Sequence, residues 1–346
     1  MQQKRMRNSL GLAALLVWAC SALTGTSVAD ESFFRGKVVR IIVGAEAGAS
    51  YDIYSRLISR HIGKHIPGRP NVVVQNMNAA GGLVAANHLF NVAEKDGTII
   101  GTFQRNSVLD SVTQNPHARF RAEEFNWLGT PASMDGNAYL FIIRHNLPYR
   151  TIEDLRKADP PLHVGVVNSP IHILRVAFGL NVKIIVGYGK NALDLAFERG
   201  EVDGNGITYA NLVSRKPQWV EKNLMRPMIQ FSSDTRLKEL PNVPTAREIA
   251  RNAEELALIK LTEAPLQIAY PISLPPGVPR ERVAMMRKAF MDTMNDPAFR
   301  DEAIKMKLDY SPRDGQTIEG AIAELTKSPP SAIASYKALF EGKGSE

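Results

Sequence analysis

The chain is nearly free of cysteine, and this removes several classes of chemistry. Its 346 residues include one cysteine, Cys20, which lies in the N-terminal segment. The rest of the chain therefore offers no thiol nucleophile, no thiolate metal ligand and no disulfide. A disulfide-free chain in an oxidising compartment needs a large core, which a chain of this length can form. The Gly-x-Ser-x-Gly motif of a serine nucleophile elbow is also absent.

Signals for a metal or a cofactor are weak as well. Among the seven histidines only His61 and His65 have a ligand-like i, i+4 spacing, and no Glu follows His61 directly. Residues 187–192 have the form of a dinucleotide fingerprint, but they do not lie in the first strand–helix–strand unit. We therefore predict no metal site, no cofactor and no catalytic residue.

The chain also lacks a long hydrophobic run after its N-terminal segment, so no membrane-spanning helix is predicted. Residues 1–29 contain early positive charges, an apolar run at 10–17 and a small-x-small site at 27–29, which is typical of a secretory signal peptide. We expect cleavage after Ala29 and a periplasmic location. The alternative is lipid anchoring at Cys20, because residues 17–20 loosely resemble a lipobox.

The excess of positive charge is modest. The chain has 42 Lys and Arg against 35 Asp and Glu, and no basic cluster with interleaved aromatic residues occurs, so nucleic acid is not a predicted partner. A small acidic ligand remains compatible with this balance. Arg56, Arg60 and Lys64 form a basic stripe at helical spacing, which is either a solvated face or a docking surface for an acidic membrane partner.

The most informative pattern lies between residues 38 and 101. Strands are predicted at 38–43 and 71–76, and each leads through a loop of small residues, 44–50 and 78–82, into a helix. The first backbone N–H groups of a helix lack intrahelical acceptors and suit an anion. Two such loops at the same edge of parallel strands predict a ligand site.

The same design recurs at 162–206, with strands predicted at 162–167, 182–186 and 202–206. Further along, we predict a helix at 246–261 and a strand at 267–272. The alternation of strands and helices indicates an α/β protein with mostly parallel sheets. We predict two α/β lobes, one from residues 30–136 together with 263–346 and the other from 137–262. Two connecting strands would form a hinge, and the cleft between the lobes could close on a ligand.

Candidate residues of the first lobe lie where strands end. Gly48, Ala49, Ser50 and Tyr51 form the first loop, although Ser50 could simply be the helix N-cap. We interpret Asp52 as structural, because the helix dipole alone stabilises an acid in the first turn. The candidates that follow the second and third strands are Ala80, Gly81, Arg105 and Asn106. An Arg at a strand end can bind a carboxylate in bidentate fashion, or it can be a solvated loop residue.

Several segments resemble one family over essentially the whole mature chain. Residues 43–52 resemble its first glycine-rich loop, 76–82 its Asn…Gly-Ala-Gly-Gly loop, and 96–98 its Asp-Gly-Tyr/Thr turn, while 200–203 and 240–245 match two later signatures. The family is that of the extracytoplasmic solute receptors of tripartite tricarboxylate transporters, also called Bug or TctC-like proteins. Ala49 and Ser50 replace common glycines, and Glu46 would repel an anion unless it faces solvent or is paired.

The resemblance implies a type II periplasmic-binding-protein fold, two lobes like a Venus flytrap, and a monomer. It implies capture of a small organic carboxylate for membrane permease subunits, without catalysis. The alternatives are a ligand sensor for a membrane signalling partner and a secreted α/β hydrolase or lyase. The resemblance also implies that loops of the second lobe meet the ligand. The candidates there are Ser169, Pro170, Ile171, Tyr188 and Gly189. Asp203 is a further candidate, expected to end a strand and either to order water or ligand in the cleft, to pair with a neighbouring Arg or to cap a turn.

Overall fold

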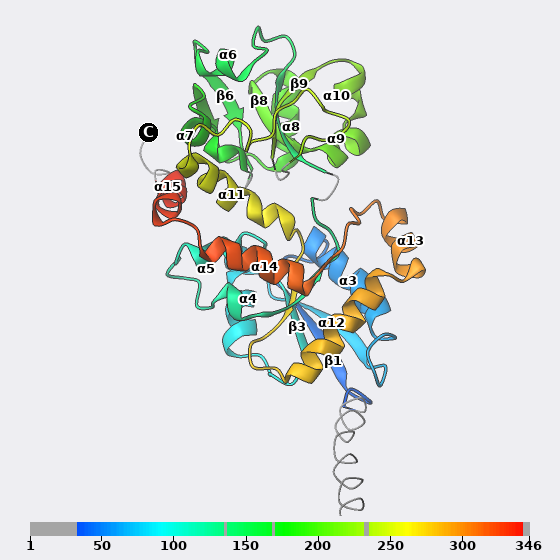
Figure 1. Ribbon diagram of the computed structural model, residues 1–346. Coiled ribbons are helices and arrows are strands. Elements are labelled where there is room, and N and C mark those ends of the chain that lie inside the picture. The colour runs from blue at the N-terminus through cyan, green and yellow to red at the C-terminus, as the bar shows by residue number, and fades with distance from the viewer. Residues whose placement is uncertain (1–32, 135–136, 168–169, 232–234, 342–346) are drawn as a thin grey trace, which may run out of the picture.

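The computed structural model describes residues 33–134, 137–167, 170–231 and 235–341. Its strands form two separate sheets, and each sheet carries its own helices, so the chain folds into two lobes (Figure 1). Among the described residues, no helix is both long and apolar enough to cross a bilayer.

The sheet of the first lobe is mixed. Its strand order is β11-β4-β10-β3-β1-β2, with β1 parallel to both β2 and β3 and with β10 antiparallel to β3 and β4. The strands are β1 (Val38–Val43), β2 (Asn71–Asn76), β3 (Ile99–Thr102), β4 (Asn126–Thr130), β10 (Ile272–Leu274) and β11 (Arg313–Asp314). The first two strands have the bounds that the sequence predicts.

Helices on both sides of this sheet bury its apolar residues. Helix α12 buries Val283, Met286, Phe290 and Met294, which recur every three or four residues and so share one helix face. Burying each such side chain contributes about 1.5–3 kcal/mol relative to exposure. The helices of this lobe are α3 (Ser50–Ile62), α4 (Leu83–Asn91), α5 (Ser107–Val112), α12 (Arg280–Met294), α13 (Pro297–Lys305) and α14 (Gly315–Thr326), with 3-10 turns η1 (Ala80–Gly82) and η2 (Ala122–Glu124).

The sheet of the second lobe has the order β7-β6-β8-β5-β9 and is mixed as well. β6 is parallel to β7 and β8, whereas β5 is antiparallel to β8 and β9. The elements are β5 (Tyr139–Arg144), α6 (Ile152–Arg156), β6 (Leu162–Gly165), η3 (Pro170–Ile173), α7 (Leu174–Phe178), β7 (Val182–Ile185), α8 (Lys190–Arg199), β8 (Gly204–Thr208), α9 (Tyr209–Arg215), α10 (Pro217–Glu221) and β9 (Met225–Phe231).

Each sheet also contains antiparallel strands, and the connections explain why. In each lobe the parallel strands end at the edge that faces the other lobe (Figure 1). A strand that enters a lobe from the other lobe starts at that same edge, so it must run in the opposite direction. This holds for β10 in the first sheet and for β5 in the second.

The return from the second lobe to the first is made by a helix rather than by the predicted strand. Helix α11 (Ala253–Gln267) begins and ends later than expected and contains Pro265 in its last turn, close to the point where the helix ends. Leu258 belongs to the core of the second lobe, and Leu261 belongs to a core of the first. Two residues after Leu261, Glu263 is fully buried and pairs with Arg247 at 2.8 Å. The predicted lobe boundaries remain predictions.

The last helix, α15 (Pro330–Glu341), also bridges the lobes. It packs along α11, and Tyr336 contacts apolar residues of both lobes (Figure 1). Two helices, α11 and α15, therefore line the junction.

Candidate ligand site between the lobes

Three loops of the first lobe converge at the carboxyl ends of β1, β2 and β3. Gly82, in the loop after β2, lies between the loops that follow β1 and β3. A Cβ added to Gly82 would lie 3.0 Å from both the Gln104 amide nitrogen and the Gly44 carbonyl oxygen. Gly82 also has φ +90°, which only glycine adopts without strain. The sequence places glycine here because the loops after three neighbouring strands approach with no room for a side chain.

Asp52 organises the first of these loops. Its carboxylate is 1% exposed and accepts hydrogen bonds from the Gly48 N–H at 2.8 Å, from Asn76 Nδ2 at 2.9 Å and from Arg56 Nε at 2.9 Å. Burial acts to raise the pKa of Asp52, but hydrogen bonds from Arg56, Gly48 and Asn76 outweigh it and hold that pKa below its usual value. Asp52 is thus structural, through specific contacts beyond the helix dipole.

These contacts decide which backbone amides are available. The Gly48 N–H is taken by Asp52, and the Ala49 N–H donates to the Glu46 carbonyl at 3.1 Å. The N–H groups of Ser50, Tyr51 and Asp52, in the first turn of α3, donate to no acceptor among the described residues. The N-cap of α3 is Ala49, which makes no side-chain hydrogen bond to the helix. The alternative in which Ser50 is the N-cap is therefore wrong. The open amides lie at 50–52. Those of Ser50 and Tyr51 belong to the predicted loop, whereas the amides of Gly48 and Ala49 are already bonded.

Tyr51 connects the first loop to two other segments. Its buried hydroxyl donates to the Ala269 carbonyl at 3.0 Å and accepts from the Arg105 N–H at 2.9 Å. Burial raises the pKa of Tyr51 to about 12, against the opposing effect of the Arg105 charge, so the hydroxyl stays protonated. The Tyr51 side chain therefore fixes the position of the Arg105 backbone.

Glu46 faces solvent and is paired. Its side chain is exposed, and its carboxylate accepts a hydrogen bond from Asn78 Nδ2 at 3.1 Å. This bond ties the first loop to the second.

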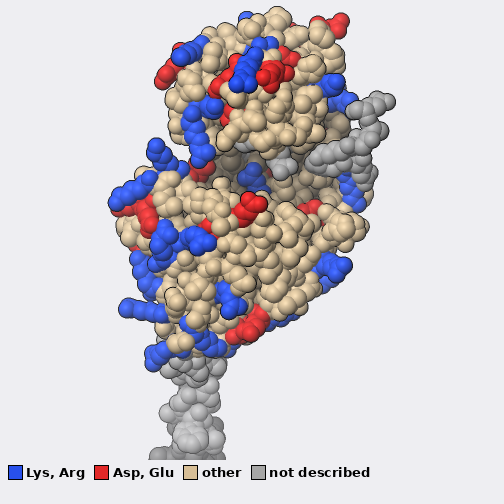
Figure 2. All heavy atoms as spheres, turned by 180° about the vertical axis from the view of Figure 1, so that it is seen from behind, with Lys and Arg blue, Asp and Glu red and all other residues tan. Residues whose placement is uncertain are grey.

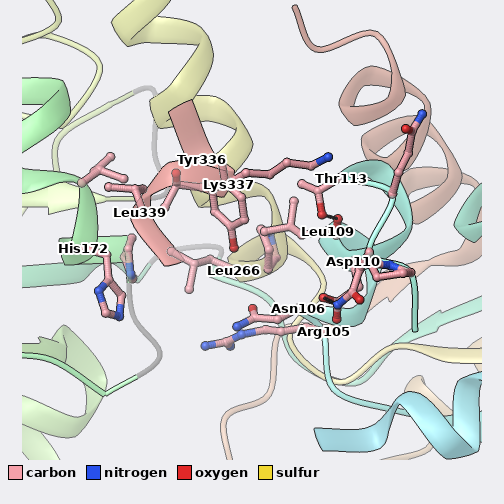
Figure 3. Close-up of a pocket in the computed structure, with 17 residues that line it drawn as sticks. Arg105, Asn106, Leu109, Asp110, Thr113, His172, Leu266, Tyr336, Lys337 and Leu339 are labelled. Carbon is pink, nitrogen blue, oxygen red and sulfur yellow. Dashed lines mark hydrogen bonds between the residues drawn. The ribbon is translucent and has the colours of Figure 1, made fainter. Parts of the chain in front are cut away.

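The surface is hollowed between the lobes (Figure 2), and a cavity of about 400 Å³ lies at this junction, beside α11 and α15 (Figure 3). The first lobe contributes Arg105, Asn106 and residues of α5, and the second contributes residues of η3. The cavity is lined by Arg105, Asn106, Leu109, Asp110, Thr113, Gln114, Asn115, Pro116, Pro170, His172, Ile173, Thr262, Pro265, Leu266, Tyr336, Lys337 and Leu339.

The charged groups of this cavity are unevenly placed. Arg105 is half-buried, and its guanidinium forms no salt bridge with a described carboxylate. Burial raises the pKa of Asp110, although Asn115 Nδ2 donates to its carboxylate at 2.8 Å. Burial, followed by the nearby Asp110 charge, raises the pKa of Tyr336, which keeps its hydroxyl neutral. Arg105 and Asn106 extend toward His172, and Asp110 lies at the other end (Figure 3).

Comparison with known proteins agrees with this arrangement. The model of the tripartite tricarboxylate transporter family receptor, TctC, matches residues 56–335. The chain belongs to this family. The resemblance seen in the sequence is thereby confirmed. A search of curated proteins finds no match.

Solved structures show the same fold at low identity. A ligand-free TctC solute-binding protein from Polaromonas is 17% identical, with a TM-score of 0.66 over 88% of this chain and 98% of that one. MatC from Rhodopseudomonas palustris, with bound malate, is 18% identical, with a TM-score of 0.55 over 87% and 98%. Rpa4515 of R. palustris, with adipate, is 16% identical, with a TM-score of 0.56 over 88% and 96%.

Some predicted residues of this TctC-family receptor are brought together. Arg105 and Asn106 of the first lobe and Pro170 of the second line the same cavity. Ser50 and Tyr51 lie beside them, linked through the Tyr51–Arg105 hydrogen bond. Ala80 and Gly81 are exposed in η1 with φ +46° and +62°, next to the first loop but outside the cavity wall.

Other predicted residues lie elsewhere. The side chain of Ile171 is fully buried in the core of the second lobe, so only its backbone could meet a ligand. Tyr188 packs against that lobe's other core, and neither it nor Gly189 lines the cavity. Ser169 falls outside the described residues.

The expectation that Asp203 ends a strand is wrong. It precedes β8, whose far end faces the junction, because β8 starts two residues later than predicted. Its carboxylate accepts from Arg144 at 3.2 Å and from the His163 N–H at 2.9 Å. Of its predicted roles, pairing with an Arg is the one the structure shows.

Sequence reasoning missed Asp110, His172 and Tyr336. Asp110 stands one helical turn after Asn106, so extending the strand-end argument by a turn would have found it. No local sequence pattern marks Tyr336 as a site residue, because it reaches the cavity only through the packing of α15 on α11.

Proposed function

We propose that this receptor captures a small organic carboxylate between its lobes and delivers it to the permease subunits of a tripartite tricarboxylate transporter. One observation carries the proposal: open amides at 50–52 and the Arg105 guanidinium lie on linked loops beside a cavity that both lobes line. The family membership and the bound malate and adipate of MatC and Rpa4515 support a carboxylate as ligand.

The proposed mechanism needs no chemical step. The amides at the start of α3 and the Arg105 guanidinium donate hydrogen bonds to the carboxylate. Because the cavity has walls from both lobes, a ligand that touches both favours the closed arrangement over the open one. We propose that the ligand is released unchanged, that the receptor acts as a monomer in the periplasm, and that export follows cleavage after Ala29 rather than lipidation at Cys20. Intact mass and gel filtration of the exported protein test the last points.

Replacement of Arg105 tests the site. We expect Arg105→Gln to weaken binding of malate or adipate about 10- to 100-fold, because hydrogen bonds to a charged group contribute about 1.5–3 kcal/mol. Arg280→Gln, at an exposed position at the start of α12, is the matched control and should bind as the wild type does. Titration calorimetry gives the affinities, and NMR of the recovered acid shows whether it is unchanged.

Two results would contradict the proposal. Turnover of the acid would assign an enzyme, and equal affinity of the wild type and Arg105→Gln would remove Arg105 from the site. For delivery, uptake of the bound acid by cells that contain the permease subunits should require the receptor. Binding without any effect on uptake would favour a sensor instead.

A further inference from the structure

The cavity has two chemically different ends. Arg105 and Asn106 extend toward His172 at one end, and Asp110 lies at the other (Figure 3). Asp110 forms no ion pair with a described cation, since its side chain accepts only from Asn115 Nδ2. A second carboxylate placed beside Asp110 would therefore meet a like charge, while the Lys337 side chain extends toward Thr113 at the end of the same helix (Figure 3).

The net charge of the cavity wall also favours a ligand with a single negative charge. Apart from His172, the charged residues of the wall are Arg105, Lys337 and Asp110, which together carry one net positive charge. A ligand with one negative charge balances this wall, whereas a dicarboxylate leaves an excess negative charge in a partly desolvated space. The volume of about 400 Å³ is within the range of pockets that hold small organic molecules.

Two hydrogen-bonding groups of the wall favour a donor on the ligand. The Asp110 carboxylate accepts hydrogen bonds, and the Tyr336 hydroxyl can donate or accept. Leu109, Leu266 and Leu339 supply apolar parts of the wall. A ligand that fits has one carboxylate, an apolar body and an uncharged donor such as an amide or hydroxyl.

Building on the proposed function, we infer that the ligand is a monoanion whose carboxylate lies near Arg105 and whose uncharged hydrogen-bond donor faces Asp110 and Tyr336. Asp110 is then a specificity-determining residue that rejects dicarboxylates. The burial that raises its pKa is consistent with a group held away from bulk water. Tyr336 makes the C-terminal helix α15 part of the ligand site.

Isosteric probes test this inference without any need to know the natural ligand. Dicarboxylates of four, six and eight carbons are compared with their monoamides, which replace one carboxylate by an amide of nearly the same shape. In the wild type we expect the monoamide to bind at least tenfold more tightly than the diacid at each length that binds. Asp110→Asn should reduce this preference to threefold or less, and Tyr336→Phe should weaken the monoamide more than the diacid.

The control is Asp301→Asn, an exposed change on α13 that should leave the preference unchanged. Asparagine keeps the acceptor for Asn115, and the wild-type comparison stands even if a variant does not fold. Equal or tighter binding of the diacids by the wild type would overturn the inference and leave the proposed function intact. A monoamide preference that survives in both folded variants would overturn the assignment to Asp110 and Tyr336. Failure of the wild type to bind any acid, malate included, would overturn the proposed function and this inference with it.

Discussion

Replacing Gly82 by alanine should disturb three loops of the first lobe at once. Its added Cβ would lie 3.0 Å from the Gln104 amide nitrogen and 3.0 Å from the Gly44 carbonyl oxygen. Both neighbours are backbone atoms, so relief requires the loops themselves to move. The residue also has φ +90°, where an alanine is strained whatever the space around it.

The neighbouring glycine provides a matched comparison. Gly81 has φ +62°, and a Cβ added there meets nothing within 4 Å. Gly81→Ala therefore carries the conformational cost alone, about 1 kcal/mol. Gly82→Ala adds the steric conflict, for which overpacking of about 1–3 kcal/mol is typical. We expect the free energy of unfolding to fall by about 1 kcal/mol in the first variant and by about 2–4 kcal/mol in the second.

Urea unfolding monitored by tryptophan fluorescence measures the two stabilities, and calorimetry with a bound acid measures the affinities. Gln104 directly precedes Arg105, so Gly82→Ala should weaken carboxylate binding, whereas Gly81→Ala should weaken it less. Equal losses of stability in the two variants would refute the close approach of the three loops. Undiminished affinity in a folded Gly82→Ala protein would show that these loops do not form the site.

Two further predictions concern contacts around helix α3 of the first lobe. Tyr51→Phe keeps the ring but removes the hydroxyl that joins Ala269 to Arg105, so stability should fall by about 1–2 kcal/mol and affinity should fall with it; an unchanged midpoint of urea unfolding would contradict this. The hydrogen bond from Lys64, followed by those from His65 and the Ala298 N–H, lowers the pKa of Asp296 from 3.8 to about 2. The stabilising contribution of Asp296 should be complete above about pH 4 and lost as pH falls toward 2. In urea titrations, Asp296→Asn should therefore be less stable than the wild type at pH 6, and its free energy of unfolding should change less between pH 4 and 2.

The basic stripe on this helix illustrates what a sequence pattern leaves open. Arg56 pairs with Asp52, Arg60 pairs with Glu302, and Lys64 pairs with Asp296. Two of these partners lie on α13 or at its start, far from the stripe in sequence. The spacing predicts one face of a helix correctly, but it cannot say that each of the three charges is paired with a carboxylate. The docking alternative loses its support because these charges are already paired.

Local signals explain which parts of the fold could be predicted. The β-branched runs at 38–43 and 71–76 end at small or polar residues, so both strands are found with the right bounds. The direction of β10 and the helical return through α11 depend on where the second lobe lies, which no local pattern encodes. The buried pair of Glu263 and Arg247 likewise forms only once α11 sits between the two cores.

In the candidate site, too, some features could be predicted from the sequence and others could not. A loop of small residues before a helix predicts open amides, and the structure has them at 50–52. The sequence could not show that Asp52 takes the Gly48 amide, because that bond depends on Asn76 and Arg56 holding the carboxylate in place. The same carboxylate that gives the loop its shape thus leaves the amides in the first turn of α3 as the open ones. There the Tyr51 hydroxyl holds the backbone of Arg105, so the two groups proposed to bind a carboxylate are set by one pair of adjacent residues, Tyr51 and Asp52.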